Sequence, residues 1–128
     1  MTEGSSGFLV AAVDDDRSVL RSLEYLLESA DYSVRLFDSG AAFLASGCLP
    51  DIACLVSDVD MPGIEGFELL RQVHALRPGL PVILITGYPE TLQRLSALGG
   101  SACRAFTKPF PGPQLLQALA ECIRNSRG

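Results

Sequence analysis

Short apolar segments alternate along the chain with longer segments in which apolar residues recur every three or four positions. Five apolar or alternating segments predict β-strands, at residues 8–13, 32–37, 52–57, 80–86 and 102–107. The strands in the middle of the chain are apolar on both faces, which is typical of strands buried inside a parallel sheet.

The intervening segments predict five helices. The clearest pattern is a row of apolar residues that a helix of 3.6 residues per turn would place on one face: Val19, Leu20, Leu23, Leu26, Leu27 and Ala30. Asp16 stands at its N-cap position. Asp38 and Ser39 can cap a short helix over residues 41–44 that ends at Gly47. Further helices are expected at residues 65–76, at 89–98 before Gly99 and Gly100, and around the leucines of residues 115–123.

Strictly alternating strands and helices predict an α/β fold. We expect a doubly wound, parallel five-stranded sheet of (βα)5 type, with the flavodoxin-like strand order 2-1-3-4-5. The 128 residues, 48% of them apolar, suffice for one core. One domain is therefore expected at residues 8–126, preceded by a flexible N-terminal arm at residues 1–7.

Composition excludes several functions. The net charge is −5 and no basic cluster occurs, so we expect no direct nucleic-acid binding by this domain. No apolar run is long enough to span a bilayer, and residues 1–7 do not resemble a signal peptide, so we expect a cytoplasmic protein. The four cysteines form no C-x-x-C pair, and Cys54 and Cys103 are interpreted as small apolar strand residues. His74 is expected on or near the helix surface.

Candidate chemistry gathers where the predicted strands end. Asp14 and Asp15 follow the first strand, Asp58 the third, Thr86 ends the fourth, and Lys108 follows the fifth. In a parallel sheet these ends share one edge, which is the usual place of a functional site. Two carboxylates about 4 Å apart repel by about 4 kcal/mol at an effective dielectric constant near 20. The three acids therefore need shared protons or a cation, and Mg²⁺ prefers such oxygen ligands.

Each of these residues also has an ordinary structural interpretation. An aspartate before a helix is usually a cap or turn residue, and a lysine in a loop is usually solvated. It is the convergence of acids, hydroxyl and ammonium on one sheet edge that favours a site. Such a site, neutralised by a divalent cation and Lys108, is suited to an incoming phosphoryl group.

At these positions the sequence resembles the receiver domains of two-component response regulators, over residues 8–123. The segments that carry the resemblance are Val13-Asp14-Asp15-Asp16, Val56-Ser57-Asp58-Val59-Asp60-Met61-Pro62-Gly63, Ile85-Thr86-Gly87 and Phe106-Thr107-Lys108-Pro109-Phe110. Residues 39–44 and 85–88 are most similar to the FixJ-type subgroup.

The resemblance implies a role for each matching residue. Asp58 would accept a phosphoryl group from a sensor histidine kinase or a phosphotransfer protein. Asp14, Asp15 and Asp58 would hold Mg²⁺ or Mn²⁺, with the backbone carbonyl of Asp60 as a further ligand. Thr86 and Lys108 would then contact the phosphoryl group. Phe106 matches the position of a switch aromatic, and the bond from Lys108 to Pro109 is expected to be cis.

Phosphorylation of Asp58 would add charge and acceptor oxygens that Thr86 and Lys108 can follow. The face formed by the fourth helix, fifth strand and fifth helix would then change shape, which predicts a phosphorylation-dependent homodimer there. Asp60, two residues after the acceptor, and Tyr88, two after Thr86, are expected to tune the lifetime of the phosphate without being required for acceptance.

Two other functions remain open on sequence grounds. The Asp58-Val59-Asp60 triplet matches the D-x-D motif of haloacid-dehalogenase-type phosphatases, although there it normally closes the first strand. A pseudo-receiver, an interaction module that does not use phosphorylation, would share the fold. The retained acids, Thr86 and Lys108 favour a phosphoacceptor signalling domain over either alternative, and over a conventional enzyme.

Overall fold

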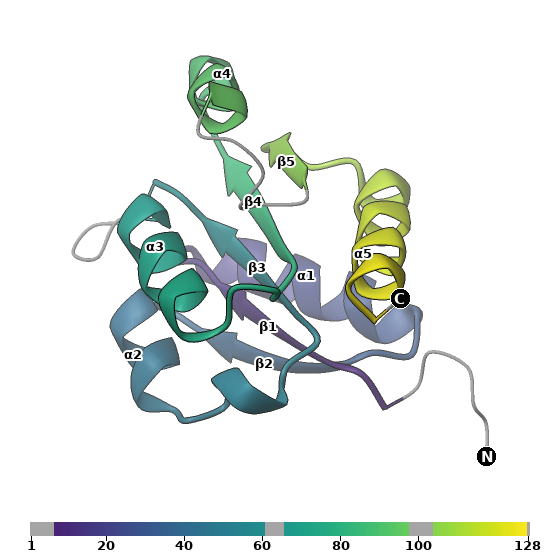
Figure 1. Ribbon diagram of the computed structural model, residues 1–128. Helices are drawn as coiled ribbons and strands as arrows, with labels where there is room; N and C mark the ends of the chain where they lie inside the picture. Colours follow the sequence, from purple (N-terminus) through teal and green to yellow (C-terminus); the bar gives the residue numbers. More distant parts are fainter. Residues whose placement is uncertain (1–6, 61–65, 98–103, 128) are drawn as a thin grey trace.

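The described residues form one parallel sheet flanked by helices, with its strands in the order β2-β1-β3-β4-β5 (Figure 1). The computed structural model describes residues 7–60, 66–97 and 104–127. The strands are β1 (Leu9–Val13), β2 (Ser33–Phe37), β3 (Cys54–Asp58), β4 (Val82–Thr86) and β5 (Arg104–Thr107). The expected α/β class and strand order 2-1-3-4-5 are therefore confirmed.

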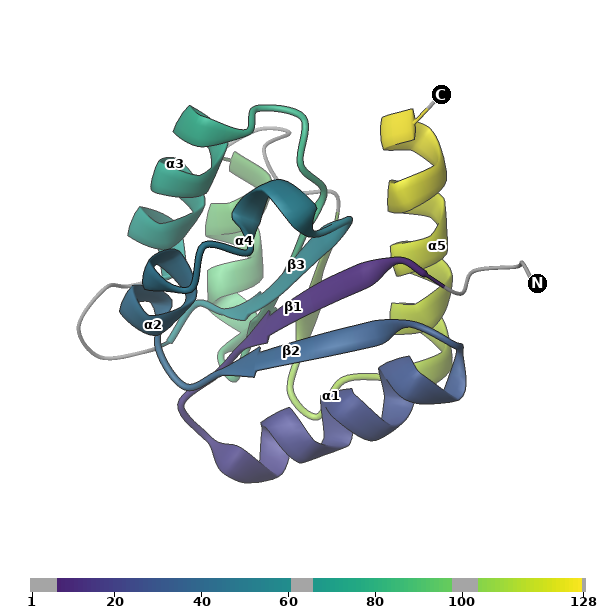
Figure 2. The same cartoon turned by 90° about the horizontal axis from the view of Figure 1, so that it is seen from below.

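Helices cover both faces of the sheet, α1 and α5 on one side and α2, α3 and α4 on the other (Figure 2). They are α1 (Arg17–Ser29), α2 (Gly40–Ala45), α3 (Gly66–Leu76), α4 (Pro89–Ala97) and α5 (Gly112–Arg127). A short 3₁₀ turn, η1 (Leu49–Asp51), precedes β3. Each expected helix is present among the described residues.

Local capping fixes where the first two helices begin. The Asp16 carboxylate accepts a hydrogen bond from the Ser18 amide at 2.8 Å, so Asp16 is the N-cap of α1 as expected. For α2 the sequence offered Asp38 and Ser39, and the structure uses Ser39, whose hydroxyl accepts from the Ala42 amide at 3.0 Å. Asp38 remains exposed at the end of β2.

Two apolar layers sandwich the sheet because alternate strand residues face opposite sides. Val10 and Ala12 pack in one cluster with Leu23 and Leu27 of α1 and Leu119 of α5. The other layer unites sheet residues with α2 and α3: Ala11, Val13, Leu84, Phe43, Leu69 and Val73. Cys54 is buried in β3, in agreement with its interpretation as a small apolar residue.

The structure shifts some predicted boundaries. Residues 49–51 form η1, so β3 begins at Cys54 instead of Ile52. β4 begins at Val82 because Pro81 has no N–H to donate to a sheet ladder, although its carbonyl accepts from the Leu55 amide at 3.1 Å. α5 begins before its leucine stripe, with Pro113 in its first turn, where proline is well tolerated.

Strand register aligns the ends that carry the candidate residues. Val13 of β1 is paired with Ser57 of β3, and Asp58 with Ile85 of β4. Thr86 is paired with Thr107 of β5, directly before Lys108. Residues far apart in the sequence therefore meet at one edge of the sheet.

Some expectations fall outside the described residues. These are the N-terminal arm apart from Gly7, the Met61-Pro62-Gly63 segment, the Gly99-Gly100 helix stop and Cys103. Within the described residues, none of the helices has the length and apolar character needed to cross a membrane.

Candidate functional site

Three carboxylates meet at the carboxyl edge of the sheet. Asp14 and Asp15 follow β1, and Asp58 is the last residue of β3. One oxygen from each lies within 4.8 Å of the others. Asp14 and Asp58 are almost fully buried, at 1% and 2% exposure, whereas Asp15 is exposed. The predicted convergence of these acids is present in the structure.

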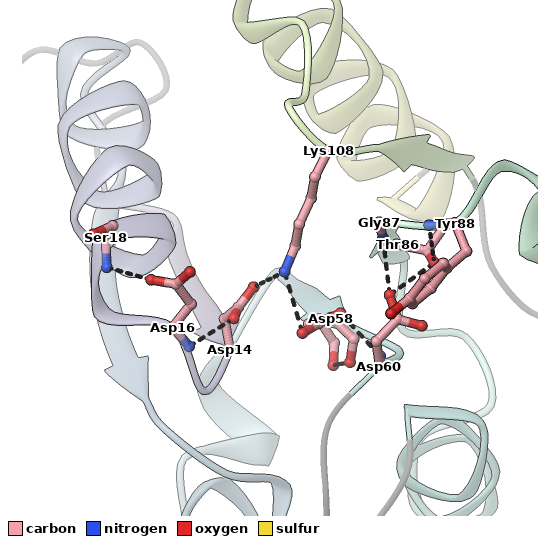
Figure 3. Close-up of polar contacts among 10 residues, drawn as sticks. Asp14, Asp16, Ser18, Asp58, Asp60, Thr86, Gly87, Tyr88 and Lys108 are labelled. Atoms are coloured by element: carbon pink, nitrogen blue, oxygen red, sulfur yellow. Dashed lines mark hydrogen bonds and ion pairs between the residues drawn. The ribbon is translucent and has the colours of Figure 1, made fainter.

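Lys108 enters the cluster from the end of β5 and reaches between the two buried acids (Figure 3). Its Nζ atom lies 3.0 Å from Asp14 Oδ2 and 3.2 Å from Asp58 Oδ2. The Lys108 amide donates to the Thr86 carbonyl at 2.7 Å, and the Lys108–Pro109 peptide bond is cis. The two ion pairs hold the ammonium group between the buried acids.

The electrostatics of the site follow from burial and shared charge. Burial raises the pKa of Asp14, and the Asp58 carboxylate adds to this, while the Asp16 amide and Lys108 oppose it. For Lys108, burial acts to lower the pKa, but the Asp14 and Asp58 carboxylates outweigh burial and raise it. Lys108 therefore stays protonated and offsets one of the three negative charges.

The arrangement fits a divalent cation. Asp14 Oδ2 is buried and accepts no well-oriented hydrogen bond, with the Lys108 ammonium near it only as an ion-pair partner. A buried, incompletely satisfied carboxylate oxygen is costly unless a cation completes its environment. With three carboxylates and one ammonium, the site retains two negative charges, which match a hard divalent ion with oxygen ligands such as Mg²⁺ or Mn²⁺.

A second group of residues lies beside the acids, at the end of β4. The Asp60 amide donates to Asp58 Oδ1 at 2.9 Å. The Asp60 carboxylate Oδ2 accepts from the Thr86 hydroxyl and from the Gly87 amide, each at 2.8 Å. The Tyr88 amide donates to Thr86 Oγ1 at 3.1 Å, and the Tyr88 side chain is exposed (Figure 3). Asp60 therefore connects the third and fourth strand ends.

Sequence reasoning did not anticipate the side-chain role of Asp60, for which it expected only the backbone carbonyl as a ligand and an effect on lifetime. It also missed the Gly87 amide as a partner of that carboxylate. Phe106 is half-buried in β5 and packs against the α1–α5 side of the core. It lines a shallow groove of about 300 Å³ with Arg104, Gln114, Gln117 and Glu121.

The fold and the acid cluster define a CheY-like receiver domain. A family model described as the response regulator receiver domain matches residues 10–120, and the chain belongs to this family. The haloacid-dehalogenase alternative is thereby set aside, in agreement with the position of the D-x-D triplet after β3 instead of β1.

Similar proteins include transcriptional response regulators and receiver domains. The transcriptional regulatory protein FixJ of Bradyrhizobium diazoefficiens is 35% identical over 119 residues, covering 91% of this chain and 57% of FixJ. The crystal structure of full-length FixJ from B. japonicum has a TM-score of 0.81 and 34% identity, covering 95% of this chain and 60% of that one.

A receiver domain structure from Methanospirillum hungatei has a TM-score of 0.83 at 29% identity, and covers 94% of this chain and 96% of its own. The chain thus spans little more than half of FixJ but nearly all of this isolated receiver domain. The similarity to FixJ agrees with the subgroup that residues 39–44 and 85–88 resemble.

Proposed function

We propose that this domain accepts a phosphoryl group on Asp58 from the phosphohistidine of a sensor histidine kinase or a phosphotransfer protein. The observation that carries the proposal is the position of Asp58, buried among Asp14, Asp15 and Lys108 at the end of β3. An Asp58 oxygen bonds to phosphorus while the bond from phosphorus to the imidazole nitrogen breaks. The nitrogen leaves with the bonding electron pair.

Asp14, Asp15 and Asp58 would hold Mg²⁺ or Mn²⁺, with the Asp60 backbone carbonyl as a further ligand. When bound, the ion supplies charge neutralisation for the phosphoryl oxygens. Lys108 serves the same purpose, since its ammonium is 3.2 Å from Asp58 Oδ2. The Asp60 amide orients the acceptor carboxylate through Oδ1.

Docking of the phosphodonor is supported by a hollow of about 390 Å³ beside Lys108. It lies between the start of α1 and the β5–α5 loop, and its lining includes Val19, Leu26, Lys108 and Phe110. This apolar surface adjoins Lys108, whose ammonium lies 3.2 Å from Asp58 Oδ2, and suits a helix that presents a phosphohistidine. The aspartyl phosphate is then hydrolysed by water. The domain therefore acts as a phosphoacceptor signalling module and catalyses only its own phosphorylation and dephosphorylation.

The decisive experiment is intact-mass spectrometry after incubation with acetyl phosphate and Mg²⁺. The wild-type chain should gain the mass of one phosphoryl group, and Asp58→Asn should gain none. Omission of Mg²⁺, or its removal with EDTA, should suppress the gain in the wild type. Equal labelling of Asp58→Asn would overturn the assignment, and no labelling of either chain would favour a pseudo-receiver.

We also propose that phosphorylation alters the α4-β5-α5 face through Thr86, Phe106 and Lys108 and promotes homodimerisation there. The groove beside Phe106 has a polar rim, with Arg104 bonded to Glu121 at 2.7 Å, which suits a reversible contact. Light scattering should report a dimer after treatment with beryllofluoride and Mg²⁺. An unchanged monomer mass would contradict this part of the proposal.

Finally, Asp60 and Tyr88 should tune the lifetime of the phosphate without being required for acceptance. Asp60 places a carboxylate next to the phosphorylation site, and exposed Tyr88 stands at its rim, where it can shield the phosphoryl group from water. Decay of the phosphorylated protein should be compared for wild type, Asp60→Asn and Tyr88→Ala. Half-lives equal to that of the wild type in both variants would dismiss this role.

A further inference from the structure

The hydrogen bonds around Thr86 leave its hydroxyl fully committed before any phosphoryl group arrives. Thr86 is buried, at 0% exposure. Its single hydroxyl proton is donated to Asp60 Oδ2 at 2.8 Å, and its oxygen accepts from the Tyr88 amide at 3.1 Å. A hydroxyl has only one proton to donate. Thr86 therefore cannot contact a phosphoryl oxygen on Asp58 without leaving Asp60.

The same Asp60 carboxylate also accepts from the Gly87 amide, and the Asp60 amide donates to Asp58. One residue thus links the phosphoacceptor to the segment that starts α4. Hydrogen bonds to a carboxylate are stronger than those between neutral groups. The links are therefore expected to hold the Thr86–Tyr88 segment in its present conformation.

We propose that Asp60 is a positioning residue that holds Thr86 away from the acceptor and so keeps the unphosphorylated domain in its inactive conformation. The Asp60 carboxylate and the phosphoryl group compete as anionic acceptors for one hydroxyl proton. Phosphorylation exchanges one acceptor of the Thr86 hydroxyl for the other. This inference rests on the proposed function, because it presumes that a phosphoryl group is formed on Asp58.

The competition for the Thr86 hydroxyl predicts a change in the affinity for a phosphoryl analogue. Because phosphoryl binding must break the Thr86–Asp60 bond, loss of the Asp60 carboxylate removes a competitor that the wild type has to displace. Asp60→Ala should therefore bind the phosphoryl analogue beryllofluoride about tenfold more tightly at constant Mg²⁺. The substitution keeps the Asp60 backbone carbonyl, which is the group expected to contribute to the metal site.

The control separates the hydrogen bond from simple removal of charge. Asp38→Ala removes a carboxylate from the same edge of the sheet, where Asp38 is exposed and is not the helix cap. Its affinity for beryllofluoride should stay within about twofold of wild type, as expected for a solvent-screened charge.

A double-mutant cycle with Thr86→Ala tests whether Asp60 acts through the hydroxyl. Isothermal titration calorimetry should show the tenfold gain for Asp60→Ala in the Thr86 background and no gain in the Thr86→Ala background. A gain in affinity that persists without the hydroxyl would show simple charge repulsion by Asp60. It would overturn the proposal that Asp60 acts by holding Thr86. Unchanged affinity of Asp60→Ala in the wild-type background would overturn it too.

A readout without phosphate or its analogue completes the experiment. In amide NMR spectra of the free protein, the Gly87 resonance should move in Asp60→Ala and stay in place in Asp38→Ala. No shift at Gly87 would overturn the proposed bond. If the wild type gains no phosphoryl group by mass spectrometry, the proposed function fails. If it gains one and the double-mutant cycle shows no coupling between Asp60 and Thr86, only the positioning role of Asp60 is wrong.

Discussion

The two ends of the parallel strands, called here the amino edge and the carboxyl edge of the sheet, differ in the polar groups that they bury. At the amino edge, Arg77 follows α3 and its Nη1 atom donates to the Leu49 carbonyl at 2.8 Å and to the Ile52 carbonyl at 2.7 Å. At the carboxyl edge, two buried carboxylates share the single ammonium of Lys108. One edge satisfies backbone groups, and the other concentrates negative charge.

Each edge also holds a buried polar atom that has no hydrogen-bond partner among the described residues. At the amino edge, His74 Nε2 lies 3.0 Å from the Leu80 carbonyl and donates to it, while the buried Nδ1 atom has no hydrogen-bond partner in the described part of the chain. The corresponding atom at the carboxyl edge is Asp14 Oδ2, which belongs to a carboxylate and has only the Lys108 ammonium, at 3.0 Å, as an ion-pair partner. Burying a carboxylate costs more free energy than burying an uncharged polar group, even when an ammonium group lies beside it.

We infer from this difference that the amino edge stabilises the fold. The carboxyl edge is arranged to bind a ligand, at a cost in stability. A cluster of like charges persists because its geometry is imposed by strands that are anchored elsewhere, in two apolar layers. Substitutions at the two edges should therefore change stability in opposite directions.

The largest effect on stability is expected at the amino edge. Arg77→Met keeps the apolar stem but removes the guanidinium, which leaves the carbonyls of Leu49 and Ile52 without their donor. The free energy of unfolding should fall by about 2 kcal/mol, the usual cost of unsatisfied buried acceptors. Urea denaturation measures it, and phosphorylation by acetyl phosphate should survive.

Arg21→Met is the matched control, because Arg21 is exposed on α1 and the same chemical change there should matter little. Equal losses of stability in both variants would mean that Arg77 has no special structural role. Loss of phosphorylation in a folded Arg77→Met protein would mean that the two edges are not independent.

A smaller effect, of opposite sign, is expected at the carboxyl edge. Asp14→Asn removes a buried charge while its side-chain oxygen can still accept from the Asp16 amide, as Asp14 Oδ1 does at 2.9 Å. Without metal, the variant should be more stable than wild type by about 1 kcal/mol. Thermal unfolding with and without Mg²⁺ measures this, and Mg²⁺ should stabilise only the wild type appreciably.

Asp38→Asn provides the comparison at the same edge of the sheet, since Asp38 is exposed. It should leave both the metal-free stability and the response to Mg²⁺ unchanged. If Asp14→Asn proves less stable than wild type in EDTA, the ion pair with Lys108 outweighs the cost of burial, and the contrast between the edges is wrong.

The two edges also differ in how far the sequence predicts them. Alternation of strands and helices places Asp14, Asp58, Thr86 and Lys108 at strand ends, and parallel topology brings strand ends together whatever the side-chain conformations are. The acid cluster could therefore be predicted. The bonds of Arg77 to the residues around η1 depend on a side chain reaching across 25 and 28 positions, and no local pattern encodes that contact.

The Asp60–Thr86 bond escaped prediction for the same reason. It joins residues 26 positions apart and depends on one carboxylate rotamer and on the path of the chain after β4. Sequence spacing identified Asp60 as a residue that tunes phosphate lifetime, but did not give its side-chain partner. Local signals were reliable where the interaction itself is local, as for the Asp16 cap of α1.

The smallest and most specific effect is a pH dependence of the Asp14→Asn stabilisation. Burial, aided by Asp58, raises the pKa of Asp14 above its ordinary value of 3.8, so the folded state binds this proton more tightly than the unfolded state. Wild-type stability therefore falls as the pH rises from 3.8 through the raised pKa, whereas asparagine does not titrate. The advantage of Asp14→Asn should be full above the raised pKa of Asp14 and vanish near pH 4. Thermal unfolding in EDTA across this range measures the difference, and an advantage that is constant with pH would assign it to packing instead of charge.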